Sequence, residues 1–240
     1  MRIGVLASGG GSNLQALIDH FTRPSSPDSR IVWVGSNDSA APALARATAA
    51  GIATGVIDNP ADEATQLAQF RDAGVELLVL AGYLKLIPAA VVGAYRGRLL
   101  NVHPSLLPSF GGAGMFGEHV HAAVLTAGAT VTGVTVHFVD EAFDRGAIIA
   151  QWPVPVVPGD TARTLAARVL RAEHRLYPVC VAAVAAGAVV LGADGRTHGR
   201  ALGDVGAPAT PSSLYWRFTL VDGPHTTLSI PDATRPAFRL

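Results

Sequence analysis

An asparagine and a histidine lie two positions apart, at Asn101 and His103, directly after a short apolar run and before Pro104. If a strand continues through both residues, their side chains lie on one face of it. Pro104 has no backbone donor, so regular strand pairing should stop there. An amide beside an imidazole can hold an oxygen that becomes negative in a transition state. On these residues alone, a capped strand end with an ordinary histidine is the simpler interpretation.

A glycine-rich loop joins the apolar run at 3–7 to a helical pattern that begins at Leu14. Glycines let the backbone approach a ligand, and a helix N-terminus offers unpaired N–H groups and positive charge. The loop therefore predicts a phosphate or carboxylate site at Gly11, Ser12 and Asn13. Leu14 stands where G-x-G-x-x-G needs its third glycine, and no G-x-x-x-x-G-K-[ST] motif is present, which disfavours dinucleotide and nucleoside triphosphate sites. The alternative is a tight strand-to-helix turn without a ligand.

Strand-like and helix-like segments alternate over residues 1–103, which predicts an α/β fold with a doubly wound, mostly parallel sheet. Ligands of such sheets bind outside the carboxyl ends of the strands. Residues 8–13, 84–87 and 101–108 all follow predicted strands, so we expect them to share one edge and one site.

The second half of the chain predicts an antiparallel hairpin, 132–139 with 148–154, followed by a long helix. The acidic turn at 140–146 joins the two strands, and one of its carboxylates could face Asn101 and His103. Gly159-Asp160 should cap this helix. The apolar residues of the helix form a stripe, and Glu173 lies beside that stripe. Tyr177-Pro178 should kink or restart the helix.

Composition excludes several classes of function. Among 240 residues, Lys+Arg and Asp+Glu are both 18, so no basic excess supports a nucleic-acid or anionic-membrane partner. Apolar runs are too short for a signal peptide or a membrane span. A single cysteine, Cys180, precludes an internal disulfide.

His119 and His121 point in different directions on a helix, so we expect no metal site. These features predict a cytoplasmic protein with a domain at 1–202 and a C-terminal extension at 203–240, loosely docked or partly disordered.

Five short motifs resemble the glycinamide ribonucleotide formyltransferases of purine synthesis. They lie at residues 8–15, 101–108 and 136–140, at Asp144, and at 173–178, and the resemblance covers roughly residues 1–200. The Asn-x-His…Asp set marks the wider folate-dependent formyltransferase group. The Gly-Ser-Asn loop points to the glycinamide ribonucleotide branch.

The resemblance implies formyl transfer from 10-formyltetrahydrofolate to the amine of glycinamide ribonucleotide. Asn101 and His103 would stabilise the tetrahedral oxyanion. Asp144 would keep His103 oriented and protonated, or handle the departing proton through water. The amine itself attacks, so neither a metal nor a covalent nucleophile is needed. The implied binding residues are Gly11, Ser12 and Asn13 for the phosphate, Glu173 for the ribose hydroxyls, and Leu84, Lys85, Ile87, Asp140 and Glu141 for the pterin.

The chain departs from the family pattern at two places within the matched region. Gly111-Gly112 replaces a common Pro-Gly within a longer, glycine-rich loop at 111–117, which is a candidate mobile lid. Lys85 stands where an arginine is common, and lysine lacks the planar guanidinium. His137, His174 and Cys180 are assigned structural roles. We expect only small-molecule partners and a monomer or homodimer.

Three rival functions remain. Formyltetrahydrofolate hydrolases carry an additional N-terminal domain, whereas this chain starts directly on its first predicted strand. Methionyl-tRNA formyltransferases carry a basic tRNA-binding domain, and the tail here has no basic excess. A non-catalytic nucleotide-binding module would lack Asn101, His103 or Asp144, and all three are present.

Overall fold

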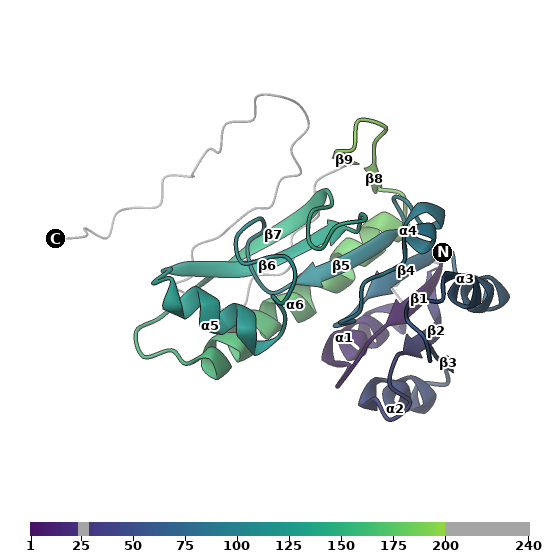
Figure 1. Cartoon of the computed structure of the whole chain (residues 1–240), viewed down its shortest axis with the longest axis horizontal. Helices are drawn as coiled ribbons and strands as arrows, with labels where there is room; N and C mark the ends of the chain where they lie inside the picture. The colour runs from purple at the N-terminus through teal and green to yellow at the C-terminus, as the bar shows by residue number, and fades with distance from the viewer. Residues whose placement is uncertain (24–28, 200–240) are drawn as a thin grey trace.

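A seven-stranded sheet forms the centre of the structure, a computed structural model that describes residues 1–23 and 29–199 (Figure 1). The strand order is β3-β2-β1-β4-β5-β6-β7, and β8 and β9 form a separate antiparallel pair. The predicted extension at 203–240 lies outside the described residues. The elements are β1 (Arg2–Leu6), α1 (Ser12–Phe21), β2 (Arg30–Ser36), α2 (Pro42–Ala49), β3 (Ala53–Val56), α3 (Glu63–Asp72), β4 (Leu77–Leu80), α4 (Ala89–Ala94), β5 (Leu99–His103), α5 (Glu118–Thr126), β6 (Val131–Phe138), β7 (Ile148–Pro155), α6 (Ala162–Ala185), β8 (Val189–Leu191) and β9 (Thr197–Gly199).

The first five strands are parallel, and the last two form an antiparallel hairpin at one edge. β1 pairs with β2 and β4, β2 with β3, and β4 with β5, all in parallel, whereas β5–β6 and β6–β7 are antiparallel. This arrangement confirms the predicted doubly wound, mostly parallel sheet with an antiparallel hairpin. It also confirms that β5 ends at His103, immediately before Pro104.

Strand residues alternate between two hydrophobic clusters, one on each face of the sheet. One cluster joins α1, α2, α5 and α6 to residues such as Val79, Leu100 and Val136. The other joins α3 and α4 to residues such as Leu80 and Leu99. Because side chains alternate along a strand, Asn101, His103 and their partners in β6 lie on the face opposite α6. That face of β5 and β6 carries Asn101, His103, Thr135 and His137.

Helix α6 differs from the predicted helix at its start and at its proline. It begins after Thr161, whose side chain caps it in a capping box, and not after Gly159-Asp160. Asp160 instead forms an ion pair with Arg168, with the nearest N and O atoms 2.6 Å apart. Pro178 lies inside one continuous helix and does not restart it. Burial of the surrounding apolar stripe offsets the local cost of the proline.

None of the helices within residues 1–23 and 29–199 combines the length and the apolar character needed to cross a membrane.

The Tyr177 hydroxyl connects α6 to the ends of two strands. It donates towards the carbonyls of Leu80 and Leu100, at 2.8 and 3.2 Å, and the side chain is fully buried. We therefore expect Tyr177→Phe to lower the free energy of unfolding by about 1–2 kcal/mol, because a buried acceptor loses its donor. Urea unfolding measures this as a lower midpoint at unchanged slope.

Tyr83→Phe is the matched control, because the buried Tyr83 hydroxyl has no hydrogen-bond partner among the described residues. This variant should keep the wild-type midpoint or exceed it. Equal midpoints for Tyr177→Phe and the wild type would contradict the assigned role.

Candidate active site

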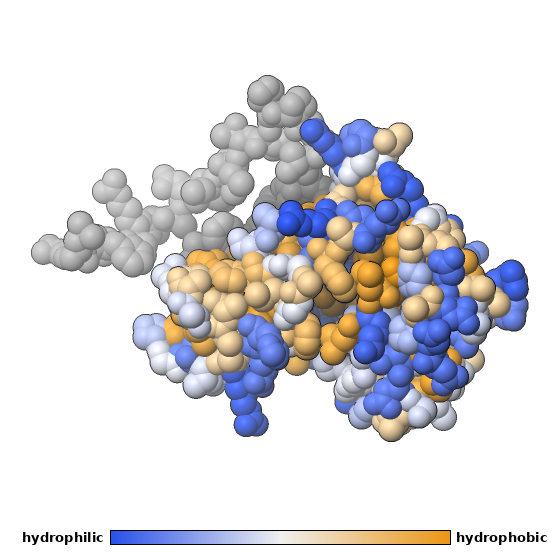
Figure 2. Space-filling view, viewed as in Figure 1, coloured by the Kyte–Doolittle hydropathy of each residue, from blue (hydrophilic) through white to orange (hydrophobic). Residues whose placement is uncertain are grey.

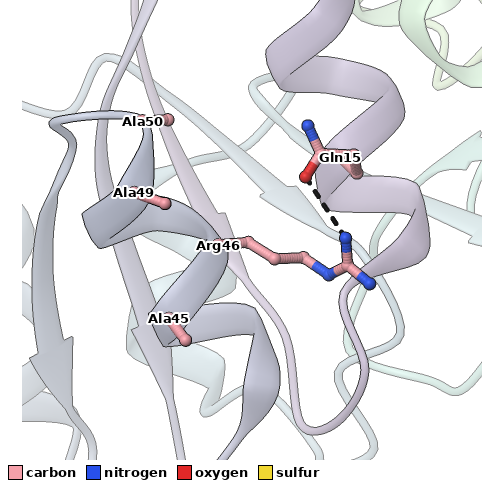
Figure 3. A pocket seen from close by; sticks show the side chains of 5 residues that line it. All are labelled: Gln15, Ala45, Arg46, Ala49 and Ala50. Carbon is pink, nitrogen blue, oxygen red and sulfur yellow. Dashed lines mark hydrogen bonds between the residues drawn. The ribbon is translucent and has the colours of Figure 1, made fainter.

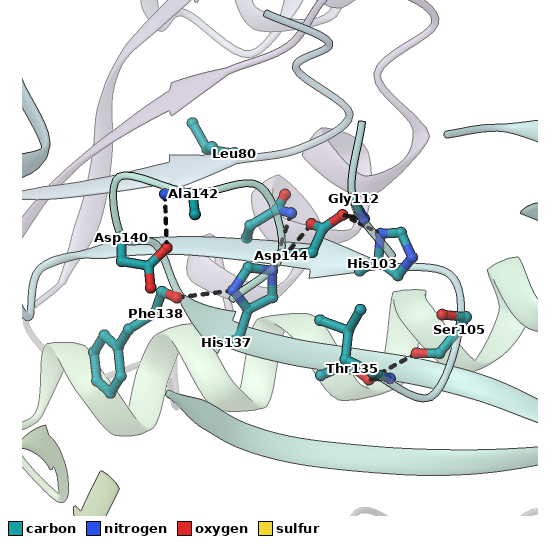
Figure 4. A network of polar contacts seen from close by, with 12 residues as sticks. Leu80, His103, Ser105, Gly112, Thr135, His137, Phe138, Asp140, Ala142 and Asp144 are labelled. Atoms are coloured by element: carbon teal, nitrogen blue, oxygen red, sulfur yellow. Dashed lines mark hydrogen bonds and ion pairs between the residues drawn. The ribbon is translucent and has the colours of Figure 1, made fainter. Parts of the chain in front are cut away.

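A buried carboxylate lies between two histidines on the polar face of β5 and β6 (Figure 4). The antiparallel register pairs Asn101 with His137 and His103 with Thr135. The connection between β6 and β7 returns over this face and places Asp144 there, with a positive φ of 57°. Asp144 Oδ2 lies 3.4 Å from His103 Nδ1, and Oδ1 lies 3.6 Å from His137 Nε2. The predicted meeting of the acidic turn with the end of β5 is therefore observed.

His103 has a neighbour at each ring nitrogen. Nε2 lies 2.8 Å from the Phe110 carbonyl, which can only accept, so Nε2 carries a proton. Burial lowers the pKa of His103, and this effect outweighs the opposing influence of Asp144 and Phe110. Asp144 acts in the predicted direction, because its charge favours the protonated ring, whereas burial opposes it. In a neutral ring with its proton on Nε2, Nδ1 faces the Asp144 carboxylate and can receive a proton.

Asp144 stays ionised although it is largely buried. Burial raises the pKa of its carboxyl, but the contact with His137, the positive charge that His103 carries when it is protonated and the amide of Gly112 together bring the pKa below its ordinary value. The Gly112 N–H donates to Oδ2 at 2.9 Å. The site thus holds a negative charge beside two imidazole rings.

His137 belongs to this cluster, although the sequence analysis gave it a structural role. Its Nδ1 lies 2.8 Å from the Phe138 carbonyl and therefore carries a proton. In a neutral ring, Nε2 then accepts from Asn101 Nδ2, 3.2 Å away. His137 fixes the orientation of the Asn101 amide and leaves the second Nδ2 hydrogen for a ligand. Only the pairing of β5 with β6 could have indicated this contact, because it places residues 101 and 137 opposite each other.

The glycine loop after β5 contacts the site from its first residues. The Phe110 carbonyl and the Gly112 N–H bind His103 and Asp144, as described above. A Cβ atom added at Gly111 would lie 3.2 Å from the Asp144 Cβ and would also clash with Leu107. A larger residue at position 111 would therefore displace the loop, because the loop passes closely over the carboxylate.

The predicted phosphate loop leads into α1 with its N–H groups uncapped. Gly11 adopts φ of 70° and is the N-cap of α1, where no side chain caps the helix. Ser12, Asn13 and the next residue therefore offer free backbone donors. The Asn13 side chain instead donates to Glu173 Oε2 at 2.5 Å. Glu173 is buried on α6, and burial raises the pKa of its carboxyl.

Residues predicted to contact a pterin differ in exposure. Leu84 and Lys85 are exposed, and Leu84 N–H donates to Ser8 Oγ at 2.9 Å, which ties this segment to the glycine loop after β1. The side chain of Ile87 is buried in the cluster with α4. Asp140 accepts a hydrogen bond from Ala142 N–H, and Glu141 is exposed.

Apolar side chains gather near the middle of the face shown in Figure 2, with hydrophilic residues around them. Several loops around the site carry large exposed apolar residues, namely Leu84, Leu86, Phe116 and Phe143. Such side chains can cover a flat aromatic ligand. Among the described residues, no three His, Cys, Asp or Glu side chains cluster as a metal ion would require.

Comparison with known proteins identifies the family. Residues 1–181 match the model of the formyl transferase family. The chain belongs to the formyl transferase family. It is similar to the structure of phosphoribosylglycinamide formyltransferase from Brucella melitensis, with 47% identity, a TM-score of 0.70, and coverage of 78% of this chain and 96% of that one. It also resembles the corresponding protein from Anaplasma phagocytophilum, with 38% identity, a TM-score of 0.76, and coverage of 82% and 92%.

Longer relatives in the same family contain a matching segment. The chain is 46% identical over 201 residues to the trifunctional purine biosynthetic protein adenosine-3 of Bos taurus, covering 81% of this chain. It spans about a fifth of that protein's length. It is also 40% identical over 200 residues to the chloroplastic phosphoribosylglycinamide formyltransferase of Vigna unguiculata, covering 64% of that protein. The region that is homologous to formyl transferases therefore covers most of the described chain.

The buried Glu173 of this formyl transferase homologue should make stability depend on pH. A carboxyl pKa that is raised in the folded state means that the folded state binds the proton more tightly than the unfolded state. Stability is therefore lost as pH rises from the unfolded pKa through the folded pKa. Glu173→Gln removes this loss, so its stability relative to the wild type should increase between pH ~4 and pH ~8.

Urea unfolding of both proteins at the two pH values measures this difference. Glu141→Gln, which changes an exposed carboxylate, is the control and should show a much smaller change. A relative stability of Glu173→Gln that does not change with pH would contradict the buried ionisation.

Proposed function

We propose that this chain transfers the formyl group of 10-formyltetrahydrofolate to the amine of glycinamide ribonucleotide. The arrangement of Asn101, His137, Asp144 and His103 on one sheet face carries the proposal, because it combines an amide donor, a proton acceptor and a fixed charge. The relatives named phosphoribosylglycinamide formyltransferase support the choice of substrates. None of the relatives reported above is named as a hydrolase.

In this proposal Asn101 binds the formyl oxygen, and His103, which the sequence analysis placed with Asn101 at the oxyanion, handles the proton. As the amine attacks the formyl carbon, a C–N bond forms and the formyl oxygen becomes negative. The free Nδ2 hydrogen of Asn101 binds this oxygen, and one such donor typically contributes roughly 2.7–4 kcal/mol to transition-state stabilisation. His137 holds the Asn101 amide in place, since it occupies the other Nδ2 hydrogen.

His103 and Asp144 move the proton that the amine loses. The unprotonated Nδ1 of His103 accepts it, directly or through a water molecule, and Asp144 stabilises the imidazolium that results. The proton is then delivered to N10 of the folate as the bond between N10 and the formyl carbon breaks. Atoms and charge balance, because the proton lost by the amine is the one gained by the leaving nitrogen.

The proposed substrate contacts come from the glycine loop, from α6, from residues 84–87 and from the turn after β6. The N–H groups of Gly11, Ser12 and Asn13 bind the phosphate, and Glu173 accepts hydrogen bonds from the ribose hydroxyls. The predicted pterin contacts stay Leu84, Lys85, Ile87, Asp140 and Glu141. Because the side chain of Ile87 is buried, its backbone would make the contact. The exposed Leu86 and Phe143 add apolar surface for the ring.

A cytoplasmic location also stays a prediction, because the Vigna unguiculata relative is named chloroplastic.

His103→Ala and Asp144→Asn should each reduce kcat by at least about 10²-fold, since each removes a group that handles charge in the transition state. The dissociation constant for glycinamide ribonucleotide, measured by calorimetry, should change little. Steady-state formyl transfer gives kcat. Normal turnover in either variant would overturn the catalytic assignment.

His198→Ala and Asp194→Asn provide matched controls. These two residues form an exposed ion pair of the same type, 2.9 Å apart, on the β8–β9 hairpin. Both variants should retain wild-type kcat.

A second assay tests the acceptor of the formyl group. Purified protein is given 10-formyltetrahydrofolate with and without glycinamide ribonucleotide. Folate consumption should require the amine. Consumption at the same rate without the amine would instead support the hydrolase.

A further inference from the structure

Arg46 of α2 contacts the glycine loop that precedes α1. Its side chain crosses a groove between the two helices, lined by Gln15, Ala45, Arg46, Ala49 and Ala50 (Figure 3). Arg46 Nε donates to the Gly10 carbonyl at 2.8 Å, and Nη1 donates to Gln15 Oε1 at 3.3 Å. Neither the sequence motifs nor the reaction described above uses this arginine.

All three glycine carbonyls of the loop are occupied. The Gly9 carbonyl accepts from Ala43 N–H at 3.1 Å, and the Gly11 carbonyl accepts from Gln15 N–H at 2.9 Å. The Gly10 carbonyl accepts from Arg46, as above. In a trans peptide the C=O and the following N–H point in opposite directions. A carbonyl that is held on the α2 side therefore directs the next N–H to the other side.

The Gly10–Gly11 peptide depends on a side chain for its orientation, whereas backbone donors hold the other two glycine carbonyls. Gly10 has open space around the position of a Cβ atom, so no side chain packs against that side of it. A glycine without steric restraint samples both signs of φ and allows its peptide to rotate. The hydrogen bond from Arg46 is thus what selects the orientation in which Gly11 N–H is available to an anion.

Arg46 also places a positive charge beside the loop. No carboxylate of the described residues lies within ion-pair distance of Arg46. Its charge therefore adds to the positive end of the α1 dipole.

We propose that Arg46 is a positioning residue for the substrate phosphate: it fixes the Gly10–Gly11 peptide so that Gly11 N–H faces the anion. This inference rests on the proposed function for the identity of the substrate. It rests on the hydrogen bonds of Arg46 and Ala43 for the geometry of the loop.

Arg46→Met keeps a long apolar side chain but removes the donor and the charge. We expect KM for glycinamide ribonucleotide to rise about tenfold, because a hydrogen bond that orders a charged contact is lost. The kcat and the KM for 10-formyltetrahydrofolate should change less than about twofold. Arg46→Lys, which keeps the charge without the planar guanidinium, should lie between Arg46→Met and the wild type.

Arg71→Met is the control, since Arg71 is an exposed arginine on α3 that pairs only with the neighbouring Asp72 among the described residues. It should keep both KM values. The same assays with glycinamide ribonucleoside, which has no phosphate, separate positioning from a general structural effect. The Arg46→Met penalty should disappear with this substrate. An equal penalty for both substrates would overturn the inference.

Inorganic phosphate provides a readout that does not depend on activity. In an NMR titration of the full chain, phosphate should shift the Gly11 amide resonance, and Arg46→Met should weaken the apparent affinity severalfold. No shift in the wild type, or equal affinities, would overturn the inference. If phosphate binds as expected and formyl transfer is absent, the proposed function fails while the role of Arg46 stands.

Discussion

The Asp144 carboxylate is mostly buried, and the rest of the site depends on holding it there. A buried charge is costly unless polar groups surround it. Here one backbone amide donates to it and two histidine rings lie against it. They come from β5, from β6 and from the glycine loop, so all three segments must be correctly placed before the carboxylate is stable. The positive φ of Asp144 shows how far the hairpin connection bends to bring the carboxylate back over the sheet.

Helix α6 connects the strands that carry this cluster to the glycine loop before α1. Tyr177 binds carbonyls of β4 and β5, and one turn earlier Glu173 binds Asn13 at the start of α1. The glycine loop before α1 is in turn held from the outside by α2. A single helix therefore fixes the spacing between the group that would bind the phosphate and the groups that would act on the formyl carbon. Two reactants that are held at a fixed distance and orientation react much faster than free reactants, so a precise spacing of this kind favours the reaction.

The fold followed from local patterns, and much of the site followed from motifs. The alternation of segments predicted the parallel sheet, and Pro104 predicted the end of β5. The role of His137 was missed because it arises from pairing across two strands, which a single strand does not reveal. The continuity of α6 through Pro178 was missed because tertiary burial overrides a local preference. The opposition between burial and the charge of Asp144 at His103 could not be predicted, because it depends on how deeply the ring is buried.

The hydrogen bond between Asn13 and Glu173 spans 160 residues. A ribosome releases the first of these residues long before the second, because chains grow at roughly 5–20 residues per second. The glycine loop and the first parallel strands can therefore form before Glu173 is available. Under the proposed function, the site is complete only after α6 has emerged and docked, so a ligand can stabilise the chain only from that point on.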